Sequence, residues 1–422
     1  MSPSGLMALA DLHDWLFAWD KFLPLGTCLV GGAVRDALLG RQRDRPDLDF
    51  VVPMDAIAVA RAIAQEYNAG FVVLDAKRQI ARVVFAAGTA DFALQEGKTL
   101  GRDLQRRDFT INAIAYDFNE RQLQDPLGGC ADLQRRCLRM VSRQNLLDDP
   151  LRLLRAYRQA AQLEFAIEAE TRAVIQELAA AIANVAAERV QAELNYLLAE
   201  PVGSNWLAAA WTDGILSPWL PAARAAEVAA IDRAAAALSA LRPAVDRRLQ
   251  AAATEQALSW LGVAKLTCLV ATAPKVAEQQ VMDLKYSRAE ARATAAMVEH
   301  LPTLLAVATI PMSSRQQYFF FQAVGDGFLG LAVLAHARGL ALEALLPYLN
   351  RFLDPGDRAA HPRTLVSGKD LMQALALPPS PKIGTLLTEI QVAFAEGKVD
   401  DATEALAFAA DWVRERAPST PS

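Results

Sequence analysis

The chain has 422 residues, 53% of them hydrophobic and 22% charged, and its formal net charge is −5 at pH 7. This length exceeds one ordinary hydrophobic core, so we expect roughly two to four packed units. The sequence lacks both a run of about 18 apolar residues and a basic leader, which predicts a cytoplasmic protein without a membrane span. The net charge argues against a protein that coats nucleic acid, although residues 101–158 carry eleven arginines against eight acidic residues.

Neither the cysteines nor the histidines indicate a site. The four cysteines are too scattered for a disulfide framework or a zinc site, and no two of the four histidines have the spacing of a metal-binding pair. We therefore expect no thiol or histidine chemistry.

The predicted elements divide the chain into an α+β head and a long helical remainder. In the head, apolar runs predict five strands, and helical spacing predicts two helices among them. The strands are expected at residues 27–30, 48–52, 71–74, 80–86 and 90–94, and the helices at 33–39 and 55–68. From about residue 147 the sequence is rich in alanine and leucine at helical spacing and is broken by Pro/Gly clusters.

Two acidic residues, Asp47 and Asp49, open the second predicted strand. Residues i and i+2 of a strand point to one side, so the two carboxylates share a face and repel each other unless a cation lies between them. The preceding Gly31-Gly32 pair stands at a predicted helix start, where backbone N–H groups bind phosphate. This pattern predicts a divalent metal site beside a phosphate-binding turn, in preference to two solvated acids.

Asp91 is a third acidic residue in a predicted strand of the head. Three carboxylates on neighbouring strands could hold magnesium ions for in-line phosphoryl transfer. An acid at a strand end is also commonly a solvated surface residue, so both interpretations stay open for Asp91.

The segment RRDFTINAIAYD begins with a pair of arginines, Arg106 and Arg107. The pair could clamp a triphosphate, and Asp108 and Asn112, four residues apart on a predicted helix, could hold ribose hydroxyls. The alternative is a helix with solvated charges and a buried apolar face. A neighbouring metal site favours the functional interpretation.

The segment DDPLRLLR forms a third cluster, from Asp148 to Arg155. Pro150 suits a first helical turn, and Asp149 and Arg152 would then share one helical face. They could offer an acceptor and donors to the edge of a nucleobase. An intrahelical salt bridge is the alternative.

Together these motifs resemble those of the class II tRNA nucleotidyltransferases, the family of CCA-adding enzymes and bacterial poly(A) polymerases in the polymerase beta superfamily. The resemblance rests on GGxVRDxLLG followed by DxD, on RRDFTxNA, and on DPxGG. These motifs are matched by residues 31–49, 106–113 and 125–129, and residues 188–198, 367–372 and 383–384 resemble further family segments. The likeness is close over roughly residues 25–200 and looser beyond.

The resemblance implies a role for each site residue. Asp47 and Asp49 would bind catalytic Mg²⁺ and activate the 3′ hydroxyl of a tRNA, with Asp91 as a third catalytic carboxylate. Gly31, Gly32 and Arg35 would hold the triphosphate, Asp108 would contact the ribose, and Asp149 with Arg152 would pair with the incoming base. The implied nucleotide-binding residues are Gly31, Gly32, Arg35, Arg106, Arg107, Asp108, Asn112, Asp149, Arg152 and Arg155.

The resemblance also implies a domain plan. We expect a polymerase-beta-like head with a five-stranded mixed sheet at residues 1–142, followed by an all-α neck, body and tail. The neck is expected at residues 143–200, the body at 201–350 and a tRNA-binding tail at 351–422.

Two departures from the family pattern concern specificity. Asp148 stands where the templating motif usually has Glu, which affects geometry more than chemistry. Only 14 residues separate Asp91 from Arg106, whereas family members that add the terminal A resemble one another in carrying a longer flexible loop here. We therefore predict addition of two cytidines to tRNA from CTP. The alternatives are complete CCA addition, which also uses ATP, and, less favoured, an A-adding enzyme or a poly(A) polymerase.

Two further classes of function fit the sequence less well. A catalytically silent RNA-binding relative would not need Asp47, Asp49, Arg106 and Asp108 together. A nucleotidyltransferase acting on a small molecule would not need the long helical half, which suits a substrate tens of ångströms long such as tRNA.

Overall fold

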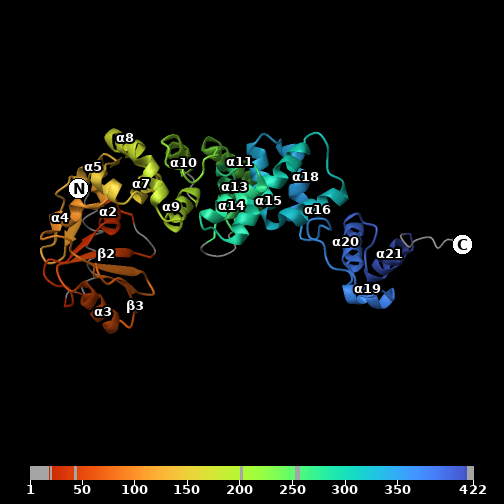
Figure 1. Ribbon diagram of the computed structural model, residues 1–422, viewed down its shortest axis with the longest axis horizontal. Helices are drawn as coiled ribbons and strands as arrows, with labels where there is room; N and C mark the ends of the chain where they lie inside the picture. The colour runs from red at the N-terminus through yellow and green to blue at the C-terminus, as the bar shows by residue number, and fades with distance from the viewer. Residues whose placement is uncertain (1–18, 20, 42–44, 200–202, 252–256, 416–422) are drawn as a thin grey trace. The chain divides into compact units, whose positions relative to one another are not determined.

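The computed structural model describes residue 19 and residues 21–41, 45–199, 203–251 and 257–415. The chain forms two compact units, Met1–Glu193 with Ala209–Pro218 and Leu194–Ala208 with Trp219–Ser422. In the described part of the chain all strands belong to the first unit, and only helices occur in the second (Figure 1). The predicted α+β class with a helical remainder is confirmed. The three boundaries between the four predicted domains stay a prediction, and the one at residues 200 and 201 lies outside the described residues.

The head contains a mixed sheet of seven strands in the order β3-β4-β5-β2-β1-β6-β7. Strands β2 and β5 are parallel, and the other neighbouring pairs are antiparallel. The strands are β1 (Cys28–Val30), β2 (Asp47–Val52), β3 (Gly70–Asp75), β4 (Ile80–Val84), β5 (Thr89–Leu94), β6 (Ala115–Asp117) and β7 (Gln122–Gln124). The five predicted strands are all present.

The prediction of five strands missed β6 and β7. The apolar residues between Phe109 and Tyr116 were interpreted as the face of a helix, but the chain makes a 3-10 turn, η2 (Thr110–Asn112), and then enters β6. Every residue of β6 is buried. A strand covered on both faces shows no alternation of polar and apolar residues, so its period is hidden in the sequence.

Helices cover both faces of the sheet. The helices are α2 (Gly32–Leu38), α3 (Ala56–Glu66), α4 (Leu100–Gln105) and α5 (Gly129–Gln134). Helix α3 packs on β3, β4 and β5. Leu104 of α4 packs in a buried cluster with Val30 and Val51. Because Val51 and Asp49 point to the same side of β2, α4 covers the face on which the acidic residues stand.

The rest of the first unit is helical apart from a small parallel sheet of β8 (Cys137–Leu138) and β9 (Ala166–Ile167). Its helices are α6 (Arg143–Asp148), α7 (Leu151–Leu163), α8 (Ala169–Leu178) and the 3-10 helix η3 (Ala179–Asn184). Helices α9 (Ala187–Ala199) and α10 (Gly203–Thr212) each contribute residues to both units.

The second unit is built from eleven further helices in its described part. They are α11 (Val228–Leu241), α12 (Pro243–Leu249), α13 (Trp260–Leu269), α14 (Pro274–Asp283), α15 (Arg288–Ala306), α16 (Ser314–Val324), α17 (Phe328–Ala337), α18 (Leu342–Leu353), α19 (Gly368–Ala374), α20 (Pro381–Ala395) and α21 (Ala402–Glu415). Among the described residues one stretch, Ser314–Ala337, is long and apolar enough to cross a membrane, but 72% of its most apolar 18-residue segment is buried inside the protein. Such burial is typical of a core helix.

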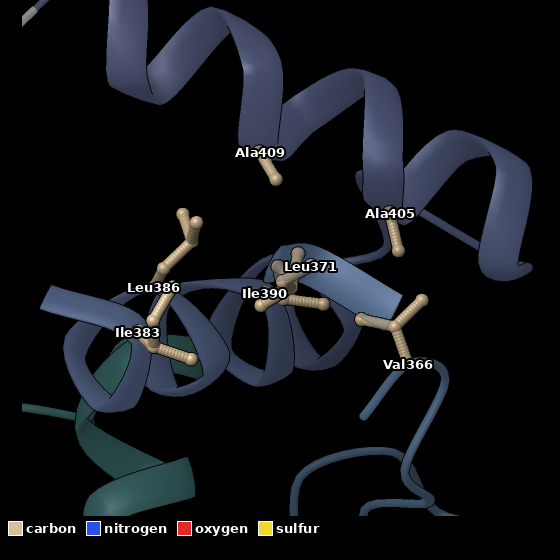
Figure 2. Close-up of a cluster of buried hydrophobic side chains, with 7 residues drawn as sticks. All are labelled: Val366, Leu371, Ile383, Leu386, Ile390, Ala405 and Ala409. Carbon is tan, nitrogen blue, oxygen red and sulfur yellow. The ribbon is translucent and has the colours of Figure 1, made fainter. Parts of the chain in front are cut away.

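The last three helices have a core of their own. Side chains from α19, α20 and α21 point toward one another, with Leu371 and Ile390 near the centre (Figure 2). Small residues of α21, Ala405 and Ala409, face this cluster and let the helix approach α20 closely (Figure 2).

Candidate functional site

The predicted metal ligands Asp47 and Asp49 lie at the start of β2. In the sheet register Asp49 stands beside Asp91 of β5 on one side and beside Val30, the last residue of β1, on the other. Residues in register on neighbouring strands project to the same face. The three predicted carboxylates therefore lie on one face, next to the turn that follows β1.

The charge of Asp49 is poorly compensated. Its partial burial raises the pKa of Asp49 to about 6; Arg107 opposes this shift, while Asp47 and Asp91 add to it. Within the described residues Asp49 accepts no hydrogen bond, whereas the exposed Asp47 accepts one from the hydroxyl of Thr89. A cation beside Asp49 would remove the cost of this charge.

Asp91 lies where it was predicted, but both of its oxygens are already bound. Arg82, its register partner on β4, donates from Nε to Oδ1 at 2.6 Å and from Nη2 to Oδ2 at 2.8 Å. A bidentate pair of this kind fixes both side chains. The role of Asp91 as a third catalytic carboxylate stays a prediction.

The residues present suit a magnesium ion held by two carboxylates. Among the described residues, no group of three or more His, Cys, Asp or Glu side chains is placed to hold a metal. Magnesium is usually held by one or two carboxylates, with water and substrate phosphates as its other ligands. Asp47 and the undercompensated Asp49 fit this requirement.

The turn after β1 needs glycine. Gly31 has φ 77° and ψ −140°, and a Cβ at this position would lie 3.1 Å from Asp49 Oδ2 and 3.3 Å from Arg107 Nη1. Helix α2 begins at Gly32, and no side chain caps it. The turn thus combines a backbone without a side chain, N–H groups at a helix start and a nearby guanidinium, which suits a phosphate.

The Arg107 guanidinium has donors to spare. Nη2 lies 3.5 Å from Asp103 Oδ2, and the buried Nε has no hydrogen-bond partner among the described residues. A buried donor without an acceptor is costly, and a bound anion would relieve it. Arg106 is instead occupied: it donates to Asp103 and pairs with Glu96 at 2.9 Å.

Asp108 and Asn112 meet as predicted, but not on a helix. Asn112 Nδ2 donates to Asp108 Oδ1 at 2.9 Å across the start of η2. The same oxygen accepts from the backbone N–H of Phe109 at 2.8 Å, so the Asp108 side chain closes a tight turn. Such local bonds compete with helix formation, which is why the prediction of a helix here is wrong.

Arg35 lies in a buried network with Asn112. It donates to Asn112 Oδ1 at 2.7 Å and to its neighbour Asp36 at 2.8 Å. Asn112 Nδ2 also donates to Gln159 of α7 at 2.9 Å. The orientation of the Asn112 amide, and through it that of Asp108, is thereby fixed. The role of Arg35 as a triphosphate ligand stays a prediction.

Helix α5 packs against the η2 turn and fixes its position. The Thr110 hydroxyl donates to the buried carboxylate of Asp132 at 2.6 Å, which also binds Arg139. A Cβ on Gly129 would lie 2.3 Å from the Thr110 carbonyl oxygen, so only glycine permits this approach. The DPxGG motif therefore positions the RRDFTxNA motif.

The predicted templating residues lie between two helices. Asp148 ends α6, and Asp149 is extended, with φ −136° and ψ 90°, so the prediction that Asp149 shares a helical face with Arg152 is wrong. Pro150 precludes the hydrogen bond that would continue α6. Asp149 instead pairs bidentately with Arg189 of α9, with distances of 3.1 and 2.9 Å. Burial alone would raise the pKa of Asp149, but bonding to Arg189 and the charge of Arg152 outweigh burial and lower it.

Arg152 connects the template region to the arginine pair. Its Nη1 donates to the Arg106 carbonyl at 2.9 Å and to the Asn145 carbonyl at 3.0 Å. Its Nε lies 4.0 Å from Asp149 Oδ2. Arg155 lies one turn further along α7, 3.6 Å from Asp108 Oδ2 and 3.0 Å from Glu193. The structure thus joins the three predicted clusters through residues 106 and 107.

Four residues that touch the predicted site were missed. Arg82 could have been suspected, since it is a lone cation in an apolar strand that faces Asp91. Arg189 lies in residues 188–198, which resemble a further segment of the family. Asp103 and Gln159 lie in helices, and nothing in the local sequence indicates that either residue contacts the site. They are Arg82, Asp103, Gln159 and Arg189.

Family models match most of the chain in three blocks. A "Poly A polymerase head domain" model matches residues 27–139, and "Probable RNA and SrmB- binding site of polymerase A" matches residues 164–227. A model of "tRNA nucleotidyltransferase domain 2" matches residues 254–410.

Full-length relatives agree with these matches. The chain is 50% identical to a CC-adding tRNA nucleotidyltransferase of Synechocystis sp., over 95% of the chain and 97% of the relative. It is 32% identical to an A-adding tRNA nucleotidyltransferase of Deinococcus radiodurans, over 93% and 96%. A solved structure of a CCA-adding enzyme with ATP shares the fold, with a TM-score of 0.75 and 21% identity over 100% of the chain and 97% of that structure. The chain therefore belongs to the class II tRNA nucleotidyltransferases, the enzyme family that includes the CCA-adding enzymes.

Proposed function

We propose that this enzyme adds two cytidines to the 3′ end of tRNA from CTP, with Mg²⁺ as cofactor, and then stops. The observation that carries the proposal is the state of the segment between β5 and Arg106. Residues 95–105 of this segment form hydrogen bonds at both ends, and α4 makes up their C-terminal part. The Gln95 N–H donates to Val52 at 2.8 Å, and the Thr99 hydroxyl caps α4.

A segment held in this way lacks the freedom of movement that a change from selecting C to selecting A would require. In relatives that add A, the resemblance implies a longer and flexible loop at this place. The 50% identical relative is named as CC-adding, which supports the same specificity. The A-adding relative at 32% identity makes A addition the alternative to be tested.

The chemistry follows from the arrangement of the side chains. Asp47 and Asp49 would hold Mg²⁺, which lowers the pKa of the attacking hydroxyl and neutralises charge on the phosphates. Arg107 and the Gly31 turn would bind the triphosphate in line with the tRNA 3′ end. No protein base is required from the described side chains.

Selection of cytosine would fall to Asp149 and Arg152. Cytosine presents an amino group as donor beside two acceptors, so a carboxylate and a guanidinium complement its edge. The Arg189 pair keeps Asp149 ionised and therefore an acceptor. Arg152 is held by two backbone carbonyls, which limits the positions that its remaining donors can take.

The test is to size the products made on two tRNA substrates. Given a tRNA that ends at the discriminator base, the enzyme should add two nucleotides with CTP, none with ATP, and two with both. Given a tRNA that already ends in CC, it should add nothing from either nucleotide. Efficient addition of A to the second substrate would overturn CC specificity and favour complete CCA addition.

A further inference from the structure

One buried carboxylate bonds to both ends of the segment that connects β5 to Arg106 and Arg107. Asp103 of α4 has no exposed surface, and it precedes Leu104, which is anchored in the core. Its Oδ1 accepts from the Glu96 N–H at 3.0 Å and from Arg106 Nη2 at 3.1 Å, and its Oδ2 lies 3.5 Å from Arg107 Nη2. Both oxygens are therefore used, and they hold the start of the connection and both arginines.

The two arginines bound by Asp103 reach different parts of the site. Arg107 Nη1 stands beside the Gly31 turn, 3.3 Å from the position of a Cβ there. The carbonyl of Arg106 accepts from Arg152 Nη1 at 2.9 Å. If Asp103 moved, Arg107 beside the Gly31 turn would be displaced more than Arg106. Arg107 has few other partners, whereas Arg106 is also held by Glu96.

We propose that Asp103 is a positioning residue for the CTP triphosphate, which acts by holding Arg107 beside the Gly31 turn. Because Asp103 is fully buried, its side chain would touch neither nucleotide nor tRNA. With Nη2 directed to Asp103, Arg107 keeps Nη1 for a phosphate, while its buried Nε has no hydrogen-bond partner among the described residues. A guanidinium that is already oriented loses less side-chain entropy when the anion binds. The inference rests on the proposed nucleotide site.

A purely structural role for Asp103 would have other consequences. If the carboxylate only anchored α4, its loss would lower stability and reduce the amount of active enzyme, without a change in KM. If it positions Arg107, its loss weakens CTP binding in enzyme that is still folded. The KM for CTP and the KM for tRNA therefore distinguish the two roles.

The first variant is Asp103→Asn in the full chain. Asparagine keeps the size and an acceptor for the Glu96 N–H, but it no longer attracts the two guanidiniums. We expect the KM for CTP to rise about tenfold, as for loss of a charge-assisted contact, and the KM for tRNA to stay within about twofold. Glu96→Gln is the matched control, since it removes the exposed partner of Arg106 and leaves Asp103 intact. Its KM for CTP should stay within about twofold.

A double-mutant cycle tests whether Asp103 acts through Arg107. In an Arg107→Lys background, Asp103→Asn should raise the KM for CTP by less than about twofold, because the group it positions is gone. A tenfold rise in both backgrounds, or an unchanged KM for CTP in folded Asp103→Asn, would overturn the proposal. Should Asp103→Asn not purify as a folded protein, Asp103→Glu, which shifts the charge by one methylene, carries the same expectations.

These measurements stay separate from the test of CC specificity. All of them use CTP and the first cytidine addition. If the wild-type enzyme also adds A, the proposed stop after CC fails, while the KM values still decide the role of Asp103.

Discussion

Two carboxylates of the first unit, Asp49 and Asp213, are treated in opposite ways by their surroundings. Asp213 accepts from the Tyr157 hydroxyl at 2.6 Å, from both Arg172 nitrogens at 2.7 and 3.1 Å, and from Gln176 at 2.7 Å. Burial alone would raise its pKa, but these bonds outweigh burial and lower it. Asp49 accepts no hydrogen bond from the described residues, and its pKa is raised to about 6.

The difference separates a residue that holds the fold from one that is kept for a ligand. Asp213 ties α7 and α8 to the segment after α10 and has no bonding capacity left. Asp49 destabilises the free protein at neutral pH and would be stabilised only by something that is not part of the chain. Perturbed carboxylates of the second kind are typical of functional sites.

The largest expected effect is that of Asp49→Asn on catalytic activity. We expect nucleotide addition to fall by about a thousandfold or more, equivalent to roughly 4 kcal/mol of transition-state stabilisation, because the amide is a poor ligand for Mg²⁺. In EDTA the variant should nevertheless be more stable than the wild type, by on the order of 1 to 2 kcal/mol, since a poorly compensated charge is gone. Single-turnover addition and urea unfolding measure the two effects.

The control for Asp49→Asn is tRNA binding, which should be unchanged, since the tRNA-binding surface is predicted in the helical part of the chain and not at Asp49. A variant that keeps near wild-type activity would remove Asp49 from the proposed metal site. A variant that is clearly less stable in EDTA would contradict the view that Asp49 is undercompensated.

Asp213→Asn should do the opposite: it should lower stability and leave activity unchanged. Asparagine cannot accept all four hydrogen bonds. If its oxygen keeps the Tyr157 hydroxyl and Arg172 Nε, which share Oδ2, its NH2 group faces the donors Arg172 Nη2 and Gln176 Nε2 in place of Oδ1. We expect a loss of about 2 kcal/mol in the free energy of unfolding, with the KM for CTP unchanged below the unfolding transition. Glu177→Gln, which removes the exposed ion pair with Arg143, is a matched control and should cost less than about 0.5 kcal/mol. A raised KM for CTP in folded Asp213→Asn would mean that this cluster also shapes the site.

The parts of the fold that could be predicted from sequence are those whose pattern is local. Strand β2 is an apolar run opened by Asp47 and Asp49, and α3 has apolar residues along one face, so both were predicted. Strand β6 was missed because its apolar residues directly follow those of the RRDFTINA segment and were interpreted with them as one helical face. Its neighbour β7 has the sequence QLQ and therefore lacks an apolar run.

The candidate site was predictable where residues act together within one segment. The Asp47 and Asp49 pair and the Gly31 turn follow from spacing of a few residues. Asp103 and Arg189 could not be found in this way, because their importance depends on which distant residue the fold brings to them. Arg189 meets Asp149 across 40 residues. The Pro150 break also changes which side chains share a face, and sequence spacing on a presumed helix does not reveal that.

The smallest expected effect, and the sharpest test of the comparison, is that the two stability differences depend on pH in separate ranges. The pKa of Asp49 in the folded chain lies above its unfolded value of about 3.9, so the penalty is present above about pH 6 and disappears as the pH falls to about 4. The pKa of Asp213 is lowered, so its stabilisation is present above about pH 4 and is lost only below that. In urea unfolding in EDTA between pH 7.5 and 3, the advantage of Asp49→Asn should therefore vanish between pH 6 and 4, while the deficit of Asp213→Asn stays constant there and shrinks at lower pH. If both differences changed over the same pH range, the two carboxylates would not differ in the way their hydrogen bonds indicate.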